Sequence, residues 1–140
     1  MEWSFTIPGD PVPWQVWARR GPPSIGILRF QAWQQQIRLH LRQQWGRRQP
    51  LEGPVAVDTT FYRRWPQSAP QSQPEAMAQW RAKHLVMKPD VGNLRKAFLD
   101  ALEGIVYLND SQVVGGQEWK DFAIKAPEGF TVMWLRELET

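Results

Sequence analysis

Apolar side chains recur along the chain at two different spacings, and these spacings predict a mixture of strands and helices. Trp3, Phe5 and Ile7 alternate with polar residues, which predicts a first strand, because successive side chains of a strand point to opposite faces. The same alternation predicts a second strand over 55–61 and a last strand over 130–134.

Three other segments have the spacing or composition of helices. Apolar residues at three- and four-residue steps predict an amphipathic helix over about 30–46, which Gly46 ends. A shorter helix is predicted after Asn93, because an asparagine oxygen can cap the exposed amides of a helix start, and it stops at Gly104. Residues 74–83 are predicted as a third, short helix.

The remaining segments are predicted as two strands and two loops. One strand is expected over 85–87 and another over 113–120, with a bulge at Gly115-Gly116. Residues 12–26 are rich in Pro, Gly, Trp and Arg and are predicted to be irregular. Residues 63–74 contain three prolines and several Gln and Ser residues, so we expect a mobile loop there.

The order β, α, β, α, β, α, β, β predicts a single α/β domain over residues 1–140, with a small mixed β-sheet flanked by helices. A chain of 140 residues with 42% apolar residues is long enough to bury a core. It has no cysteine, which excludes disulfides and fits a reducing cytoplasm. No apolar run approaches the roughly 18 residues of a membrane span, so we expect a cytoplasmic protein with no membrane partner.

Charge is distributed unevenly, although the net charge is only +3. Residues 90–140 contain nine acidic and five basic residues, whereas residues 11–51 contain seven arginines and no acidic residue. Arginine binds phosphate through paired hydrogen bonds as well as through charge. A basic surface beside a carboxylate cluster is what an enzyme that cuts a phosphate backbone requires, whereas a solvated basic face is the alternative.

Two aspartates are the candidate centre of chemistry. Asp90 is expected at the end of a strand and Asp110 just before the next one, with one helix between them, so both can reach one edge of the sheet. Paired carboxylates without His or Cys suit hard cations, and Lys96 can offset charge that builds on a phosphate. A structural alternative remains, in which Asp90 caps the helix, Lys96 pairs with Asp100, and Asp110 belongs to a turn.

The residues around these aspartates resemble the RusA-type Holliday junction resolvases. That family carries Lys-Pro-Asp-x-Asp-Asn-Leu-x-Lys, then Asp-Ala-Leu, then Asp-Asp-x-Gln-Val. The corresponding residues here are Lys88-Pro89-Asp90-Val91-Gly92-Asn93-Leu94, Lys96, Asp100-Ala101-Leu102 and Asn109-Asp110-Ser111-Gln112-Val113. The start of the chain, 7–11 followed by Arg19, also looks like the family's opening strand and basic loop.

The resemblance implies a RusA-like fold and a homodimeric, Mg²⁺-dependent endonuclease, with Mn²⁺ as a substitute, that nicks opposing strands of four-way junction DNA symmetrically in recombination and repair. It implies that Asp90 and Asp110 are catalytic metal ligands and that Lys96 is the catalytic, phosphate-facing base. Asp100 and Asn109 are further candidate metal ligands. The resemblance and the basic surface together give the candidate DNA-binding residues Arg19, Arg20, Arg38, Arg42, Lys88 and Lys120.

Two positions depart from the family pattern. Gly92 stands where the family carries a second aspartate, which on an extended segment would lie on the same side as Asp90. Asn109 replaces an acid but keeps a carbonyl oxygen. Fewer anionic ligands mean weaker metal binding, so a junction-binding protein with weakened or absent cleavage is the first alternative. A protein-interaction domain that uses the nine tryptophans as a contact surface is the second.

Overall fold

The computed structural model of the chain describes residues 1–14, 21–124 and 126–139. It confirms the predicted class, a mixed α/β fold with one five-stranded sheet. The elements in chain order are β1 (Glu2–Pro8), α1 (Ile25–Trp45), β2 (Val55–Arg64), α2 (Pro74–Leu85), α3 (Val91–Leu102), the 3₁₀ turn η1 (Asp110–Gln112), β3 (Val113–Gly115), β4 (Glu118–Ala123) and β5 (Phe130–Glu137).

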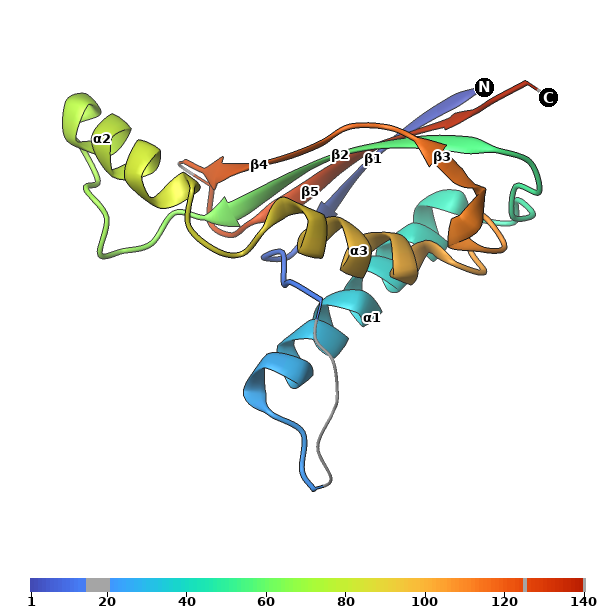
Figure 1. Cartoon of the computed structure of the whole chain (residues 1–140), viewed down its shortest axis with the longest axis horizontal. Coiled ribbons are helices and arrows are strands. Elements are labelled where there is room, and N and C mark those ends of the chain that lie inside the picture. The colour runs from blue at the N-terminus through green and yellow to red at the C-terminus, as the bar shows by residue number, and fades with distance from the viewer. Residues whose placement is uncertain (15–20, 125, 140) are drawn as a thin grey trace.

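The strand β2 lies at the centre of the sheet and connects its two halves. It pairs antiparallel with β5 on one side, and β5 pairs antiparallel with β1. On the other side β2 pairs parallel with β3 and then with β4, which follow one another along the same edge. The sheet is therefore antiparallel in one half and parallel in the other, as Figure 1 shows.

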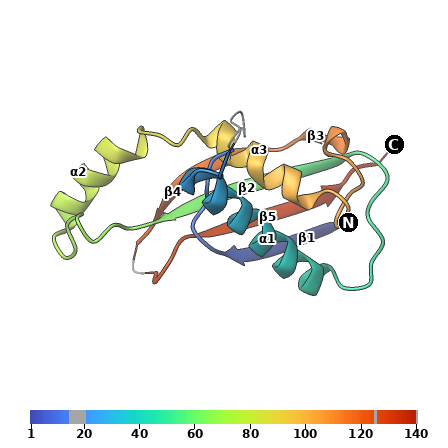
Figure 2. The same ribbon diagram turned by 90° about the horizontal axis from the view of Figure 1, so that it is seen from below.

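The helices α1 and α3 cover one face of the sheet, and α2 lies beyond the ends of β2 and β4 (Figures 1 and 2). No described helix lies on the opposite face, which we call the bare face. No helix in the described ranges is long and apolar enough to cross a membrane.

The core fills the space between the covered face and the two helices. Trp33 of α1, Phe61 of β2 and Phe98 of α3 meet with ring centroids 5.8–6.2 Å apart. Aromatic pairs in such tilted arrangements add about 0.5–1.5 kcal/mol each to the free energy gained by burying their area. This three-way contact fixes α3, and with it the motif that α3 carries, against the sheet.

Helix α1 begins five residues earlier than the apolar spacing predicted. Ser24 caps it, because its hydroxyl oxygen accepts a hydrogen bond from the amide of Ile27 at 3.2 Å. At the other end, Gly46 stops the helix as predicted, with φ of 68° and its amide donating to the carbonyl of Arg42 at 3.0 Å. The predicted stripe is confirmed as buried and comprises Phe30, Trp33, Ile37, Leu41 and Trp45.

The last predicted strand is confirmed as β5. The alternating apolar residues that predicted it, Phe130, Val132 and Trp134, lie on the bare face rather than against the helices. Thr131, Met133 and Leu135 are fully buried against the helices, whereas Trp134 is 48% exposed. The two faces of β5 are both largely apolar, so alternation locates the strand without telling which face packs. The bare face thereby carries Val132 and Trp134.

The strand predicted over 85–87 is wrong. Leu85 is the last residue of α2, and residues 86–90 form turns and bends. The carbonyls of this segment accept hydrogen bonds from side chains rather than from a neighbouring strand. The short helix predicted over 74–83 is confirmed and runs two residues further.

The predicted loop over 63–74 starts later than expected, because Arg63 and Arg64 belong to β2. The rest packs beneath α2, where the indole nitrogen of Trp65 donates to the carbonyl of Pro70 at 3.0 Å. The mobility of this loop stays a prediction.

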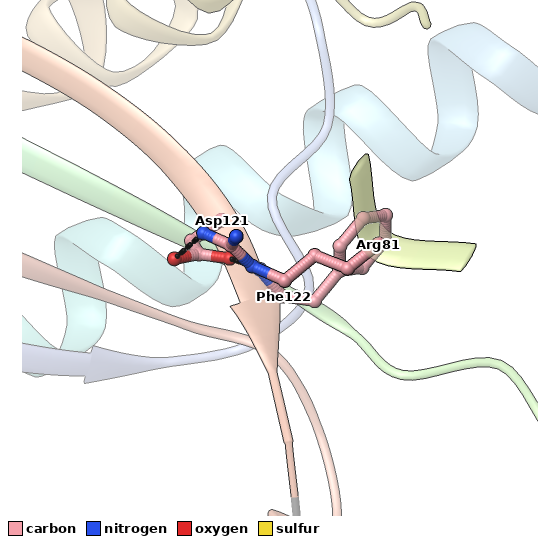
Figure 3. Close-up of polar contacts among 3 residues, drawn as sticks. All are labelled: Arg81, Asp121 and Phe122. Atoms are coloured by element: carbon pink, nitrogen blue, oxygen red, sulfur yellow. Dashed lines mark hydrogen bonds and ion pairs between the residues drawn. The ribbon is translucent and has the colours of Figure 1, made fainter. Parts of the chain in front are cut away.

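Helix α2 is attached to β4 by an ion pair and a small apolar cluster. The guanidinium of Arg81 donates two hydrogen bonds to the carboxylate of Asp121, at 2.7 and 2.8 Å, and the amide of Phe122 donates to the same carboxylate (Figure 3). The hydrogen bonds from Arg81 lower the pKa of Asp121 below its usual range. Trp80 packs against Phe122 next to this pair.

The predicted strand over 113–120 is divided into β3 and β4, and the division lies where the bulge was predicted. The pairing with β2 shifts register between Val55 and Ala56. Gly116 has φ of 126°, and a Cβ at this position would overlap the carbonyl of Val57. The backbone of Gly116 therefore approaches β2 more closely than any residue with a side chain allows.

We predict that Gly116→Ala lowers the free energy of unfolding by about 2 kcal/mol or more, because the new methyl group meets backbone at a positive φ. Gly115→Ala is the matched control, since a Cβ there meets no atom within 4 Å and its φ is not positive. Urea unfolding followed by tryptophan fluorescence measures both variants. Equal stability of the two would contradict the close approach at Gly116.

Candidate functional site

A cleft of about 480 Å³ lies between the first half of α3 and the turn from β3 into β4. The cleft brings together three positions of the motif, Gly92, Lys96 and Asp110. It is also lined by Arg95, Leu99, Val113, Val114, Gly115 and Gly116. The segments around residues 92 and 110 are therefore joined in space, but Asp90, which the sequence placed at the same edge as Asp110, does not line the cleft.

Asp90, rather than Asn93, is the residue at which α3 starts. Its backbone is extended, and its carbonyl accepts hydrogen bonds from the amides of Asn93 and Leu94 at 3.1 and 3.2 Å. Its side chain makes no capping hydrogen bond and is exposed. The carboxylate is thus not used by the helix, which weakens the structural alternative for Asp90.

Gly92 lies in the first turn of α3, so the expected extended geometry around it is wrong. Residues four apart on a helix share a face, and a side chain at 92 would therefore lie beside Lys96 in the cleft. A Cβ at Gly92 meets no atom within 4 Å, and its φ is not positive. The missing carboxylate leaves open space, and nothing in the packing requires glycine here.

The turn η1 positions Asp110 through a network of side-chain hydrogen bonds. The oxygen of the Gln112 side chain accepts from the amides of Leu108 and Asn109 at 2.8 and 2.9 Å. Its nitrogen donates to the carbonyls of Leu51 and Gly53 at 2.7 and 3.0 Å. The Gln112 amide group is therefore fully used and ties the turn to the chain just before β2.

Two neighbours complete the support of Asp110. The Asn109 side chain accepts from the amide of Ser111 at 2.9 Å, and Glu103 accepts from the amide of Asp110 itself at 2.9 Å. Asn109 acts as a cap in this structure, and its proposed role as a metal ligand stays a prediction. Behind the turn, the buried Tyr107 hydroxyl donates to the carbonyl of Leu99. Burial, followed by the charges of Asp110 and Glu103, raises the pKa of Tyr107.

The ammonium group of Lys96 lies 4.7 Å from the centre of the Trp14 ring. Such a cation–π contact contributes about 0.5–1 kcal/mol at an exposed site and orients the cation without neutralising it. Trp14 is itself held, because its amide donates to the carbonyl of Asn93 at 3.1 Å and its ring packs on Phe30. Sequence reasoning missed Trp14, which had no signal beyond being one of nine tryptophans.

Arg95 is a second residue of the cleft that sequence reasoning missed. Its Nε lies 3.0 Å from a carboxylate oxygen of Glu118, and its Nη1 donates to Thr59 and to the carbonyl of Gln117 at 3.3 and 3.4 Å. Its side chain is only 12% exposed. Arg95 therefore connects α3 to β2 and β4, and its position next to Lys96 was the only available signal.

Asp100 and Arg38 lie on the other side of α3, in its contact with α1. Asp100 accepts a hydrogen bond from the side-chain nitrogen of Gln34 at 3.0 Å, and Arg38 donates to the carbonyl of Ala101 at 3.2 Å. Neither residue lines the cleft. The proposed roles of Asp100 in metal binding and of Arg38 in DNA binding stay predictions. Both side chains make hydrogen bonds that join α1 to α3.

The remaining candidate DNA-binding residues differ in their surroundings. Arg42 and Lys88 are exposed, whereas Lys120 is partly buried and donates to two backbone carbonyls. Burial and the charge of Arg63 lower the pKa of Lys120, and Asp90 partly offsets this effect. The predictions for Arg19 and Arg20 lie outside the described residues.

The described residues do not fit a metal ion held by three protein carboxylates. Within 1–14, 21–124 and 126–139, no group of three or more His, Cys, Asp or Glu residues is close enough to hold one. The cleft is lined by one carboxylate, that of Asp110, together with the cations Arg95 and Lys96. This set favours an anion such as a phosphate over a metal ion in the absence of further oxygen ligands.

Comparison with known proteins gives two findings. The family model described as "Endodeoxyribonuclease RusA" matches residues 17–129, most of the chain. The chain is also similar to the uncharacterized protein YqaN of Bacillus subtilis (strain 168), at 38% identity over 65 residues, or 46% of each protein. The matched part therefore spans less than half of that relative.

We predict that Gln112→Glu costs about 2 kcal/mol of stability, because it keeps the oxygen that accepts from Leu108 and Asn109 but turns a second oxygen toward the carbonyls of Leu51 and Gly53. Gln117→Glu is the control, since that side chain is exposed and the charge change is the same. Thermal unfolding at neutral pH compares them. An equal small effect of both substitutions would exclude the positioning network.

Proposed function

Because the chain belongs to the RusA endodeoxyribonuclease family, we propose that it binds four-way (Holliday) junction DNA and resolves it by symmetric paired nicks in recombination and repair. The observation that carries this proposal is the cleft, which Lys96 and Asp110 both line together with Gly92, two residues after the helix cap Asp90. We propose a cytoplasmic location from this action on cellular DNA. The family assignment supports nuclease activity, and the following roles are our proposals.

Lys96 is the residue best placed to receive a phosphate of the DNA backbone. Its ammonium is exposed in the cleft and is oriented by the ring of Trp14, and no salt bridge joins it to a carboxylate in the described part of the chain. A cation held in this way stabilises charge that develops on phosphate oxygens during displacement. Asp110 and Asp90 are the proposed acidic partners, both exposed and neither used by a helix cap.

We also propose, from the family alone, dependence on Mg²⁺ with Mn²⁺ as a substitute. Two carboxylates supply too few ligands for tight binding, so such an ion would depend on water and DNA phosphate oxygens for its other positions. The expected consequence is a weak affinity for the ion in the absence of DNA.

A second function, junction binding without cleavage, is favoured by Gly92. The cleft contains two cations and one carboxylate, so it attracts phosphate but lacks an acid that the family pattern places there. Binding of this kind is mainly electrostatic and positions the backbone without reading sequence.

Incubation of the protein with a labelled four-way junction and Mg²⁺ or Mn²⁺ distinguishes the two functions. We predict that Gly92→Asp raises nicking at least tenfold, because the new carboxylate enters open space beside Lys96. Gly92→Asn is the matched control, with nearly the same shape and no charge. Asp90→Asn and Asp110→Asn should each abolish nicking in the Gly92→Asp background.

Symmetric nicks from the unmodified chain support resolution, whereas binding with nicks only after Gly92→Asp supports the binding function. Full nicking by Asp90→Asn and Asp110→Asn would refute the assigned roles. Affinity that does not change between 50 and 200 mM salt would refute DNA binding itself. Binding through six or more phosphate contacts becomes about a thousandfold weaker over that range of salt.

We further propose that the protein acts as a homodimer and that the bare face is its interface. Strand pairing places Val132 beside Thr60 and Thr60 beside Trp119, with Trp134 in the next row, so these side chains form one patch. Trp119 and Trp134 are 64% and 48% exposed. Two-fold pairing of such faces would give two clefts per assembly, matching the two strands cut in a symmetric junction.

The charge of the bare face argues for a protein rather than DNA as its partner. By strand pairing, this face carries the acidic residues Glu2, Asp58 and Asp121 and the basic residues Arg64 and Arg136. A face with this composition does not attract phosphate, and exposed tryptophans are typical of protein interfaces.

We predict that Trp134→Lys converts the dimer to a monomer, because a charge would be buried in the apolar interface. Leu39→Lys is the control, since Leu39 is similarly exposed, at 56%, but lies on α1 on the other side of the sheet. Sedimentation equilibrium measures the mass of each. A monomeric unmodified protein, or a Trp134→Lys variant that remains dimeric, would contradict the proposed interface.

A further inference from the structure

Three successive backbone carbonyls just before Asp90 accept hydrogen bonds from two cations of the sheet. The ammonium of Lys120 donates to the carbonyls of Met87 and Pro89 at 2.8 and 2.9 Å. The guanidinium of Arg63 donates to the carbonyl between them, that of Lys88, at 3.5 Å. We call this set of contacts the carbonyl clamp.

The clamp does what a neighbouring strand or helix would otherwise do for this segment. Residues 86–89 form no strand or helix, so the carbonyls of Met87, Lys88 and Pro89 have no regular backbone partner. Hydrogen bonds from a charged donor are roughly twice as strong as those between neutral groups. Two of the three ammonium hydrogens of Lys120 are used in this way, which fixes the backbone that leads into Asp90.

The two cations come from neighbouring strands, which makes the clamp rigid. Lys120 lies on β4 opposite Phe61 of β2, and Arg63 lies two residues further along β2. β2 is the central strand, every residue of β4 is paired with it, and Arg63 also lies over the ring of Phe122 at 6.0 Å. The clamp thereby fixes the position of Asp90 relative to the sheet. The hydrogen bonds of η1 fix the position of Asp110 in the same way.

We propose that Lys120, with Arg63, is a positioning residue for Asp90 and does not contact DNA phosphate. Sequence reasoning assigned Lys120 to DNA binding, but two of its three ammonium donors already hold the chain, which leaves at most one for a phosphate. The inference rests on the proposed function only where it concerns cleavage. Its structural part concerns the backbone of 87–94 and can be tested in the absence of DNA.

The first test uses the salt dependence of junction binding. The slope of the logarithm of the binding constant against the logarithm of the salt concentration changes by about 0.9 for each phosphate contact. We compare Lys120→Met with Lys88→Met, because Lys88 lies on the clamped segment and its side chain is exposed. The expected slope for Lys120→Met equals that of the unmodified protein. Lys88→Met should lower the slope by about 0.9, which corresponds to the loss of one phosphate contact. A decrease of about 0.9 for Lys120→Met would overturn the proposal.

The second test is amide hydrogen exchange of the free protein. The amides of Met87, Asn93 and Leu94 donate hydrogen bonds within or next to the clamped segment. Lys120→Met should speed their exchange at least tenfold and leave the amides of β5 unchanged, while Lys120→Arg should retain most of the protection. Unchanged exchange in Lys120→Met would refute the clamp, whether or not the protein binds or cuts DNA.

The third test separates positioning from simple loss of fold in a nicking form of the protein, the Gly92→Asp variant if the unmodified chain does not cut. Lys120→Met should lower kcat at least tenfold with KM changed less than twofold, and Lys120→Arg should restore most of kcat. A rise in KM with kcat retained would instead indicate a DNA contact. Absence of junction binding in every variant would refute the proposed function and leave the exchange result to decide the clamp.

Discussion

The contact between Trp33, Phe61 and Phe98 is the interaction on which the candidate site depends. It joins α1, the central strand β2 and α3 in one place, so the helix that carries the motif cannot shift without opening the core. Protein interiors are packed as densely as crystals, and such contacts resist small displacements. The geometry of Gly92 and Lys96 relative to Asp110 follows from this packing.

The fold uses its cations for structure to an unexpected degree. Arg38, Arg95 and Lys120 each bind backbone carbonyls or an acidic partner at the edges of α3 and its neighbouring strands. These contacts fix both ends of the motif, and they leave Lys96 as the cation of the cleft whose described contact is an aromatic ring. A basic sequence is therefore a poor guide to which cations meet DNA, because several are already engaged by the protein.

Much of the fold followed from the sequence because local patterns and tertiary packing agree. The stripe in α1, the alternation in β1 and β2 and the glycine interruption before β4 all appear as predicted. The errors lie where the deciding partner is distant in sequence. The strand predicted over 85–87 is absent because α2 continues to Leu85 and Lys120 binds the carbonyl of Met87. The bare face of β5 is apolar, so alternation could not show which side α1 covers.

The motif located the site but not its details, for the same reason. Sequence identified Asp90, Lys96 and Asp110, and the structure brings two of these positions into one cleft. It could not reveal that Trp14 orients Lys96 or that Gln112 spans from η1 to the chain before β2, because both contacts join segments that no local pattern relates.

The open space at Gly92 also bears on how this protein can change over generations. Codons for glycine and aspartate differ at a single nucleotide when both end in a pyrimidine, and no neighbouring atom opposes a side chain at this position. A lineage can therefore lose the carboxylate and regain it without passing through a destabilised intermediate. At this position selection on chemistry is separated from selection on folding, because a side chain at residue 92 meets no neighbouring atom within 4 Å.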